Sequence, residues 1–256
     1  MGLHLLAVLV TSLAAAAVPA TPAEEPLAQE VHFSEGFTIK VPASWARYPQ
    51  ETVDAASEFM RKNMKKDAPE HCICGFQRDP WNGAISLPYM FVVFRRGRIA
   101  EDSLRDIKRV EAAVSRGIDT AKKAGSVTEA YASTPTYDED AHILWTDISL
   151  RVGEGGQTKG LLATILTEDG AILVYLYSAA DTFDKNKELF ERIARAVVPD
   201  APYKPRLADN LPTAEAVGNF VHIAEGAFTA AAVGAGLYFL LKRKKRQPPL
   251  DNNLLP

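Results

Sequence analysis

Apolar and polar residues alternate in short stretches between residues 31 and 199, and this pattern predicts one folded domain. Phe37, Ile39 and Val41 are separated by single polar residues, a period of two that is typical of a strand with one buried face. Pro42 ends this strand, because proline cannot donate a ladder hydrogen bond. Further strands are predicted at 72–78, 89–94, 144–152, 161–167 and 171–178.

Three other segments carry apolar residues every three or four positions, which predicts helices with one buried stripe. They span residues 52–66, 102–123 and 181–197. Between the last two strands, Asp169 and Gly170 form the strongest short hairpin signal in the chain. The order of these elements predicts an α+β fold, in which an antiparallel sheet is covered by helices.

The pattern changes near the C-terminus, where residues 226–241 contain no charged side chain. About twenty apolar residues are needed to cross a bilayer as a helix, so we predict a transmembrane helix at 219–241. Five consecutive cations follow it and favour the cytoplasmic side of the membrane. These stop-transfer residues are Lys242, Arg243, Lys244, Lys245 and Arg246. The sequence therefore predicts a cytoplasmic tail at 242–256 and an outward-facing domain.

The N-terminus has the features of a secretory signal peptide, with an apolar core followed by small residues. We predict the signal at 1–20, with cleavage after Ala20 or Ala23, and a disordered polar leader at 21–30. The folded domain is expected at 31–199, and a proline-containing stalk at 200–218 is expected to join it to the span. The protein is thus predicted to lie in the cytoplasmic (inner) membrane as a single-pass protein, with its domain in the periplasm or outside the cell.

The formal net charge of −3 hides an uneven distribution of charge. Without the basic tail, the exported part carries a charge of about −7, which argues against nucleic acid as a partner of the domain. The basic run itself follows an apolar span directly, and we interpret it as a topological signal.

Only two cysteines occur, and they follow a histidine in the order His71, Cys72, Ile73, Cys74. If this stretch is a regular strand, both sulfur atoms lie on the same face. Three interpretations stay open. The cysteines are a structural pair or inert thiols, which we favour; or they form a strained, easily reduced redox pair; or His71, Cys72 and Cys74 bind a soft metal ion such as Cu(I) or Zn²⁺.

The predicted span has two features that suggest more than anchoring. His222 and Glu225 lie three residues apart at its outer end, at the depth of the lipid headgroups. Gly226, Ala230 and Gly234 recur every four residues and form a ridge of small side chains. Such ridges let transmembrane helices approach closely, so self-association through the span is a hypothesis.

No catalytic motif is present in the sequence. The acidic run at 138–140 is interpreted as a solvated loop, and the neighbouring His142 has no serine or cysteine motif with which to form a triad. We therefore predict a protein that is not an enzyme, and we predict no cofactor.

The opening strand resembles that of the PsbP/Mog1/DcrB-like family, which ends in Val-Pro with a tryptophan nearby. The resemblance is carried by Phe37, Thr38, Ile39, Lys40, Val41, Pro42, Ala43, Ser44 and Trp45. The hairpin at 161–178 and the helix after it are also similar to the family's ending. The resemblance covers roughly 31–199 and implies an antiparallel sheet covered by helices. It also implies a non-enzymatic accessory or binding domain, and it names no site residue.

Taken together, the sequence predicts a membrane-anchored binding or accessory domain outside the cytoplasm, which engages a protein partner in the cell envelope. Two alternatives remain. One is a thiol-redox or soft-metal protein that works through the Cys-x-Cys pair. The other is a subunit of a membrane complex that acts through its span.

Overall fold

The computed structural model describes residues 24–63, 71–97, 99, 106–123, 127–151 and 157–204. The predicted signal peptide at 1–20, span at 219–241 and tail at 242–256 lie outside these residues, as does most of the predicted stalk. Within the described ranges, no helix is both long enough and apolar enough to cross a membrane.

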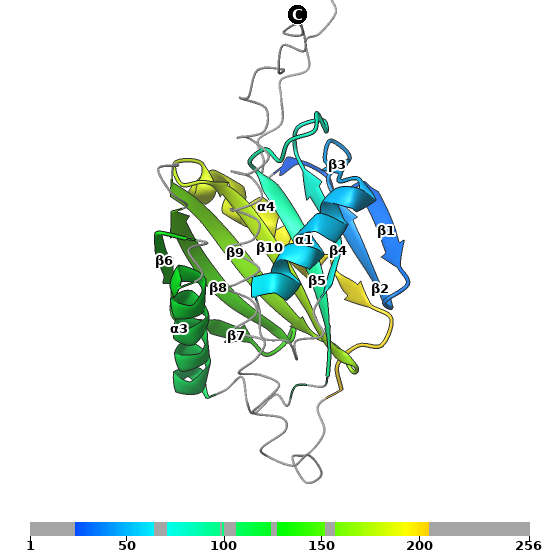
Figure 1. Cartoon of the computed structure of the whole chain (residues 1–256). Helices are drawn as coiled ribbons and strands as arrows, with labels where there is room; N and C mark the ends of the chain where they lie inside the picture. The colour runs from blue at the N-terminus through cyan, green and yellow to red at the C-terminus, as the bar shows by residue number, and fades with distance from the viewer. Residues whose placement is uncertain are drawn as a thin grey trace, which may run out of the picture.

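The described chain forms two antiparallel sheets and three helices (Figure 1). The small sheet has the order β1-β2-β11, from β1 (Gln29–Phe33), β2 (Phe37–Val41) and β11 (Val198–Pro199). The large sheet has the order β3-β4-β5-β10-β9-β8-β6, and β7 also pairs with β8. Its strands are β3 (Ala46–Arg47), β4 (His71–Gln77), β5 (Tyr89–Arg96), β6 (Glu129–Ala132), β7 (Thr136–Asp138), β8 (Ile143–Arg151), β9 (Gln157–Leu166) and β10 (Gly170–Ala179). The α+β class with antiparallel sheets, predicted from the sequence, is confirmed.

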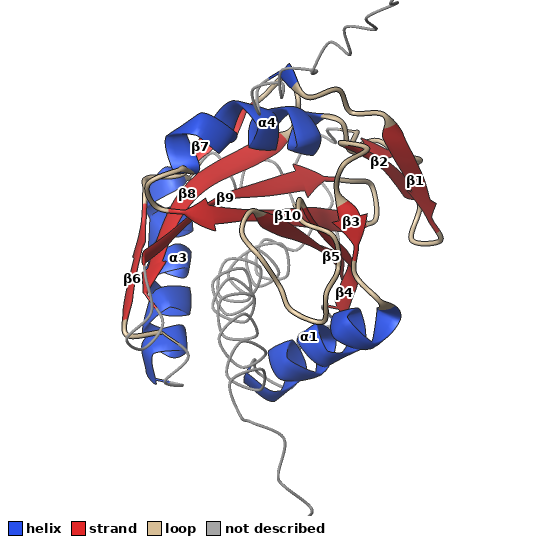
Figure 2. Cartoon of the chain, turned by 90° about the horizontal axis from the view of Figure 1, so that it is seen from above, coloured by secondary structure: helices blue, strands red, loops and turns tan. Residues whose placement is uncertain are grey.

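The helices lie on the two faces of the large sheet (Figure 2). One face carries α1 (Gln50–Asn63), which packs along β4, and α3 (Ile107–Lys123), which packs along β6. The other face carries α4 (Phe183–Arg195), which packs on β9 and β10, together with the small sheet. Two apolar clusters result, one on each face, because side chains of a strand alternate between its two sides.

The predicted elements agree well with those observed. The helix expected at 181–197 is α4, and the described parts of the helices expected at 52–66 and 102–123 are α1 and α3. Asp169 and Gly170 connect β9 to β10 as predicted, with Ala171 opposite Leu166 at the start of the ladder. In β8 the residues alternate between the faces as expected, so that Thr146 and Ile148 are buried while Ser149 is half-buried.

Both ends of the described chain extend the domain beyond its predicted limits. At the N-terminal end, β1 begins at Gln29 within the predicted leader, and Arg192 Nη2 donates to the Glu25 carbonyl at 3.2 Å. At the C-terminal end, Pro202 forms a bridge with Thr167, and Tyr203 is buried. Backbone pairing keeps these polar segments on the domain although they carry little apolar periodicity.

Candidate functional site

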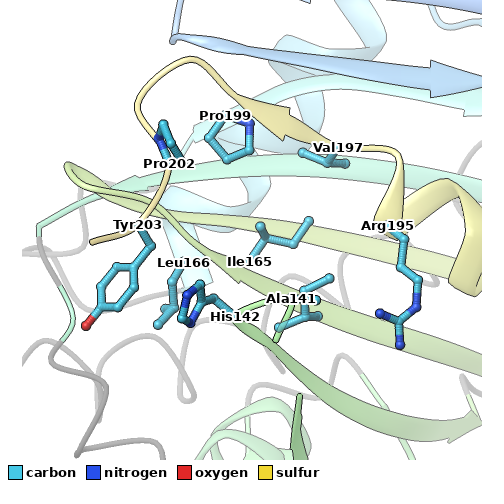
Figure 3. A pocket seen from close by; sticks show the side chains of 10 residues that line it. Ala141, His142, Ile165, Leu166, Arg195, Val197, Pro199, Pro202 and Tyr203 are labelled. Atoms are coloured by element: carbon cyan, nitrogen blue, oxygen red, sulfur yellow. The ribbon is translucent and has the colours of Figure 1, made fainter. Parts of the chain in front are cut away.

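A pocket of about 300 Å³ opens where four parts of the domain meet (Figure 3). These parts are the turn before β8, the end of β9, the last residue of α4 and the segment at 197–203 that follows it. Most of the lining is apolar or proline. The lining residues are Ala141, His142, Ile143, Ile165, Leu166, Arg195, Val197, Pro199, Pro202 and Tyr203.

His142 contributes a polar group to this pocket and is held by the turn between β7 and β8. Its φ angle of 51° lies in the left-handed region, which a histidine adopts at a cost of roughly 1 kcal/mol. The conformation is stabilised because the His142 carbonyl accepts a hydrogen bond from Leu166 N at 3.1 Å. The His142 ring lies 3.2 Å from the Tyr137 hydroxyl through Nδ1 and 5.2 Å from the Tyr203 ring, centroid to centroid.

Arg195 supplies the positive charge at the pocket. Its Nη2 lies 2.8 Å from Asp138 Oδ2, and its guanidinium lies over the Trp145 ring at 5.3 Å from the centroid. The Asp138 carboxylate is fixed in turn by the Ala141 amide, which donates to its Oδ1 at 3.0 Å. This amide first, and Arg195 second, hold the pKa of Asp138 below its usual value of 3.8. A planar cation is thereby oriented on an aromatic surface beside an apolar pocket.

Asp138 is predicted to make the domain sensitive to strong acid. Because its pKa is lower when folded than when unfolded, its contribution is fully present above the usual value and is lost as pH falls through the folded value. Asp138→Asn should lower the free energy of unfolding at pH 7 by about 1 kcal/mol, through loss of a charged hydrogen bond. It should also flatten the pH dependence of stability below pH 3.8. Urea unfolding of the two proteins from pH 7 downward measures both effects, and identical pH curves would contradict the prediction.

The predicted Cys-x-Cys arrangement is wrong in one important respect. We expected both sulfur atoms on one face of a regular strand, but Cys72 belongs to the cluster beneath α1 and Cys74 to the cluster beneath α4. The cause is a β-bulge: Cys72 pairs with Val93 and Cys74 with Val92, so that Ile73 is an extra residue. An inserted residue shifts the alternation by one, and the two thiols therefore lie on opposite sides of the sheet.

Burial gives both cysteines the properties of inert thiols. Both are free and at most 5% exposed. Removal from water raises the pKa of each thiol well above its usual value, and for Cys72 this outweighs the lowering effect of a hydrogen bond with the backbone of Cys74. A thiolate is the reactive form for redox exchange and for metal binding, so both groups are held in the unreactive form.

We predict that neither cysteine reacts with iodoacetamide at pH 8 while the domain is folded. In guanidinium chloride both should be alkylated within minutes, because the unfolded chain exposes thiols of ordinary pKa. Mass spectrometry after timed quenching gives the number of modified cysteines. Alkylation of the folded domain at the rate of the unfolded chain would show an accessible, reactive thiol.

The remaining sequence candidates are not brought together by the described structure. His71 is exposed, and its Nε2 lies 3.6 Å from Glu35 Oε1 rather than beside either sulfur. Among the described residues, no group of three or more His, Cys, Asp or Glu side chains is arranged to hold a metal ion. His222, Glu225 and the ridge of Gly226, Ala230 and Gly234 lie outside the described residues, as do the five cations at 242–246, and their roles stay predictions.

Sequence reasoning did not find the pocket. The sequence shows no catalytic partner for His142, and it predicts no role for Arg195. No spacing links them, because they are 53 positions apart and meet only when α4 packs beside β8. One sequence feature could have indicated the pocket. The prolines after α4 are compatible with an ordered turn on the domain as well as with an extended stalk.

Comparisons with known proteins concern the fold only. A scan against protein-family models finds no match, and a search of curated proteins finds no similar sequence. Among solved structures, the chain is similar to the solution structure of cyanobacterial PsbP (CyanoP) from Synechocystis sp. PCC 6803. The identity is 16%, the TM-score is 0.42, and the match covers 67% of this chain and 91% of that chain. A similarity of this size assigns no partner, activity or site, and membership of the PsbP/Mog1/DcrB-like family stays a prediction.

Proposed function

We propose that this protein is a membrane-anchored accessory domain outside the cytoplasm that binds a protein partner of the cell envelope and catalyses no reaction. The signal-like N-terminus, the apolar run at 226–241 and the five cations after it support the anchored topology. The α+β domain supplies the binding surface.

The observation that carries the proposal is the composition of the pocket. None of its ten lining residues is a serine, threonine, cysteine, aspartate or glutamate, so the lining offers no aliphatic hydroxyl or thiol nucleophile and no carboxylate base beside His142. Its two prolines give a rigid rim, and Arg195 lies at one side. Such a pocket suits an apolar side chain of a bound peptide, with a carboxylate of that peptide near the guanidinium.

The topology is tested first, in cells that express the full chain. Alkaline extraction separates an inserted protein from one that is only associated with the membrane. Protease added from outside should remove the domain and leave the tail protected. Release of the full chain by alkaline extraction would overturn the anchored part of the proposal.

The binding surface is tested by photo-crosslinking in the same cells. A photoreactive amino acid replaces Val198, which is 57% exposed and lies between the lining residues Val197 and Pro199. The control position is Tyr131, which is 68% exposed on β6, away from the pocket. We expect a protein adduct from position 198 and none of the same mass from position 131.

Charge reversal then asks whether Arg195 takes part in partner binding. Arg195→Glu should reduce the adduct at position 198 by about tenfold, the loss expected for one charged contact. Lys185→Glu reverses an exposed charge on the same helix and is the matched control. Equal adduct yields in the two variants would rule out Arg195 as a binding residue, and no adduct above the control would overturn the proposed surface.

A further inference from the structure

The α1/α3 face of the large sheet has an apolar central strip. We define this strip by Val93 on β5, Leu144 on β8, Leu162 on β9, and Leu173 and Tyr175 on β10. All five side chains belong to one cluster and are at most 5% exposed. Leu173 pairs with Val93 across β5 and β10, so the strip is continuous from strand to strand.

The described helices lie at the two sides of this strip and not on it. On this face α1 packs along β4 and α3 along β6, at opposite ends of the strand order (Figure 2). Between them, no helix or strand in the described ranges lies over β5, β10 and β9 (Figure 2). The loop between β4 and β5 covers part of the cluster, since Ile85 belongs to it and Trp81 and Leu87 pack against it. An apolar surface that extends over four strands requires a covering layer, since a sheet buries its apolar face against another element.

We propose that the apolar segment at 220–241 of this same chain packs against the central strip, as an alternative to crossing the membrane. The segment is the long apolar stretch that follows the described domain in the sequence. The other undescribed stretches inside the domain, 64–70, 100–105, 124–126 and 152–156, are short and mostly polar or charged. The inference rests on the proposed function, because residues 220–241 lie in the predicted transmembrane helix at 219–241, and it gives them a second binding place.

The dimensions of the strip fit one helix. Five strand spacings separate β4 from β6, which is roughly 24 Å at about 4.8 Å each. Packed helices lie about 8–10 Å apart, so one further helix fits between α1 and α3 and a second does not. Lengthwise, a helix of about 22 residues measures roughly 33 Å. The ten residues of β10 extend over roughly the same length.

The connection between domain and segment also permits this packing. The described chain ends at Lys204, next to Tyr203, which is buried in the same apolar cluster as the central strip. The chain therefore leaves the domain at the border of this face. Fifteen residues, 205–219, separate Lys204 from Phe220. They can span up to roughly 50 Å, more than the length of the strip.

Burial of the segment on the domain would couple membrane insertion to exposure of the strip. When residues 220–241 enter a bilayer, the central strip loses its cover and becomes an apolar surface available to a partner. When they lie on the domain, both apolar surfaces are removed from water. The same segment thus acts as an anchor in one state and as an intramolecular cover in the other.

The test is disulfide trapping in the full chain. Thr164→Cys places a thiol in the middle of the strip, because Thr164 is 2% exposed and pairs with Leu144 on one side and Leu173 on the other. It is combined with single cysteines at every position from 222 to 241, so that all faces and heights of the segment are sampled. Ser149→Cys is the matched control, since residue 149 lies on the opposite face of β8. Each segment cysteine alone gives the background from the native Cys72.

In detergent-free buffer, copper-phenanthroline should produce disulfides within one chain for Thr164→Cys, at positions that recur every three or four residues. With Ser149→Cys, no disulfide should form above the background from the native Cys72. In phospholipid vesicles the yield should fall in the fraction that resists alkaline extraction. The proposal is overturned if no position of the scan forms a disulfide within one chain, if the disulfides link two chains, or if the yield is unchanged in vesicles. Alkaline extraction reports on membrane anchoring separately, so failure of the trapping does not imply failure of the proposed function.

Discussion

Gly170→Ala is expected to destabilise the domain by about 3 kcal/mol or more, the largest effect of any single methyl group added to it. Gly170 begins β10 and lies opposite Arg96 on β5. A Cβ atom at this position would overlap the carbonyl oxygen of Arg95, which is backbone and cannot turn away as a side chain can. The ladder between β5 and β10 at the centre of the large sheet would have to separate locally. A domain of this size has about 5–15 kcal/mol of stability, so the variant should be marginally folded.

Urea unfolding followed by circular dichroism measures this effect. The matched control is Gly83→Ala, because Gly83 has a φ of +82° but open space around it. Gly83→Ala should cost about 1 kcal/mol from backbone strain alone. The difference between the two variants isolates the steric overlap at Gly170, and equal losses would show that β5 and β10 are further apart than described.

Phe190→Ala is expected to cost about 3–5 kcal/mol, because it removes a large side chain from a site with no solvent access. Phe190 is 0% exposed and packs beneath α4, with its ring 6.4 Å from that of Phe183. Leu189 and Ile193 of the same helix are also fully buried, so α4 closes this face of the sheet. The cavity left by the substitution is enclosed on all sides, and the surroundings can relax little.

Calorimetry should show a fall in melting temperature of roughly 10 °C for Phe190→Ala in a domain of this size. Lys185→Ala on the exposed side of the same helix should change the melting temperature by at most about 1–2 °C. A small effect of Phe190→Ala would mean that α4 is held by its ends and not by its buried side. The result matters for the pocket, because α4 carries Arg195 at its last residue.

The pocket lies at the end of β9 and shares two residues with the apolar cluster that contains the central strip. Leu166 of β9 contributes to the pocket, and Tyr203 both lines the pocket and belongs to the cluster of the strip.

The sequence determined the elements of this protein. Apolar residues that recur every two positions located β2 and β8, and apolar residues that recur every three or four positions located the three described helices. The reason is that burial of one side of an element requires apolar residues at its own period. The Asp-Gly pair located the β9–β10 hairpin, because few residues fit that turn. Strands β1, β3, β6, β7 and β11 were missed, because they are short or polar and are held mainly by backbone hydrogen bonds to a neighbour.

Only the tertiary structure decided which residues meet. The bulge at Ile73 separates the two thiols onto opposite faces, and a bulge depends on how one strand pairs with the next rather than on its own pattern. Arg195, Asp138 and His142 come together because α4 packs beside the β7–β8 turn, a contact between segments that carry no shared spacing. Local periodicity indicates which side of an element is buried. It does not indicate which element covers that side. For the central strip, disulfide trapping tests whether residues 220–241 are the covering element.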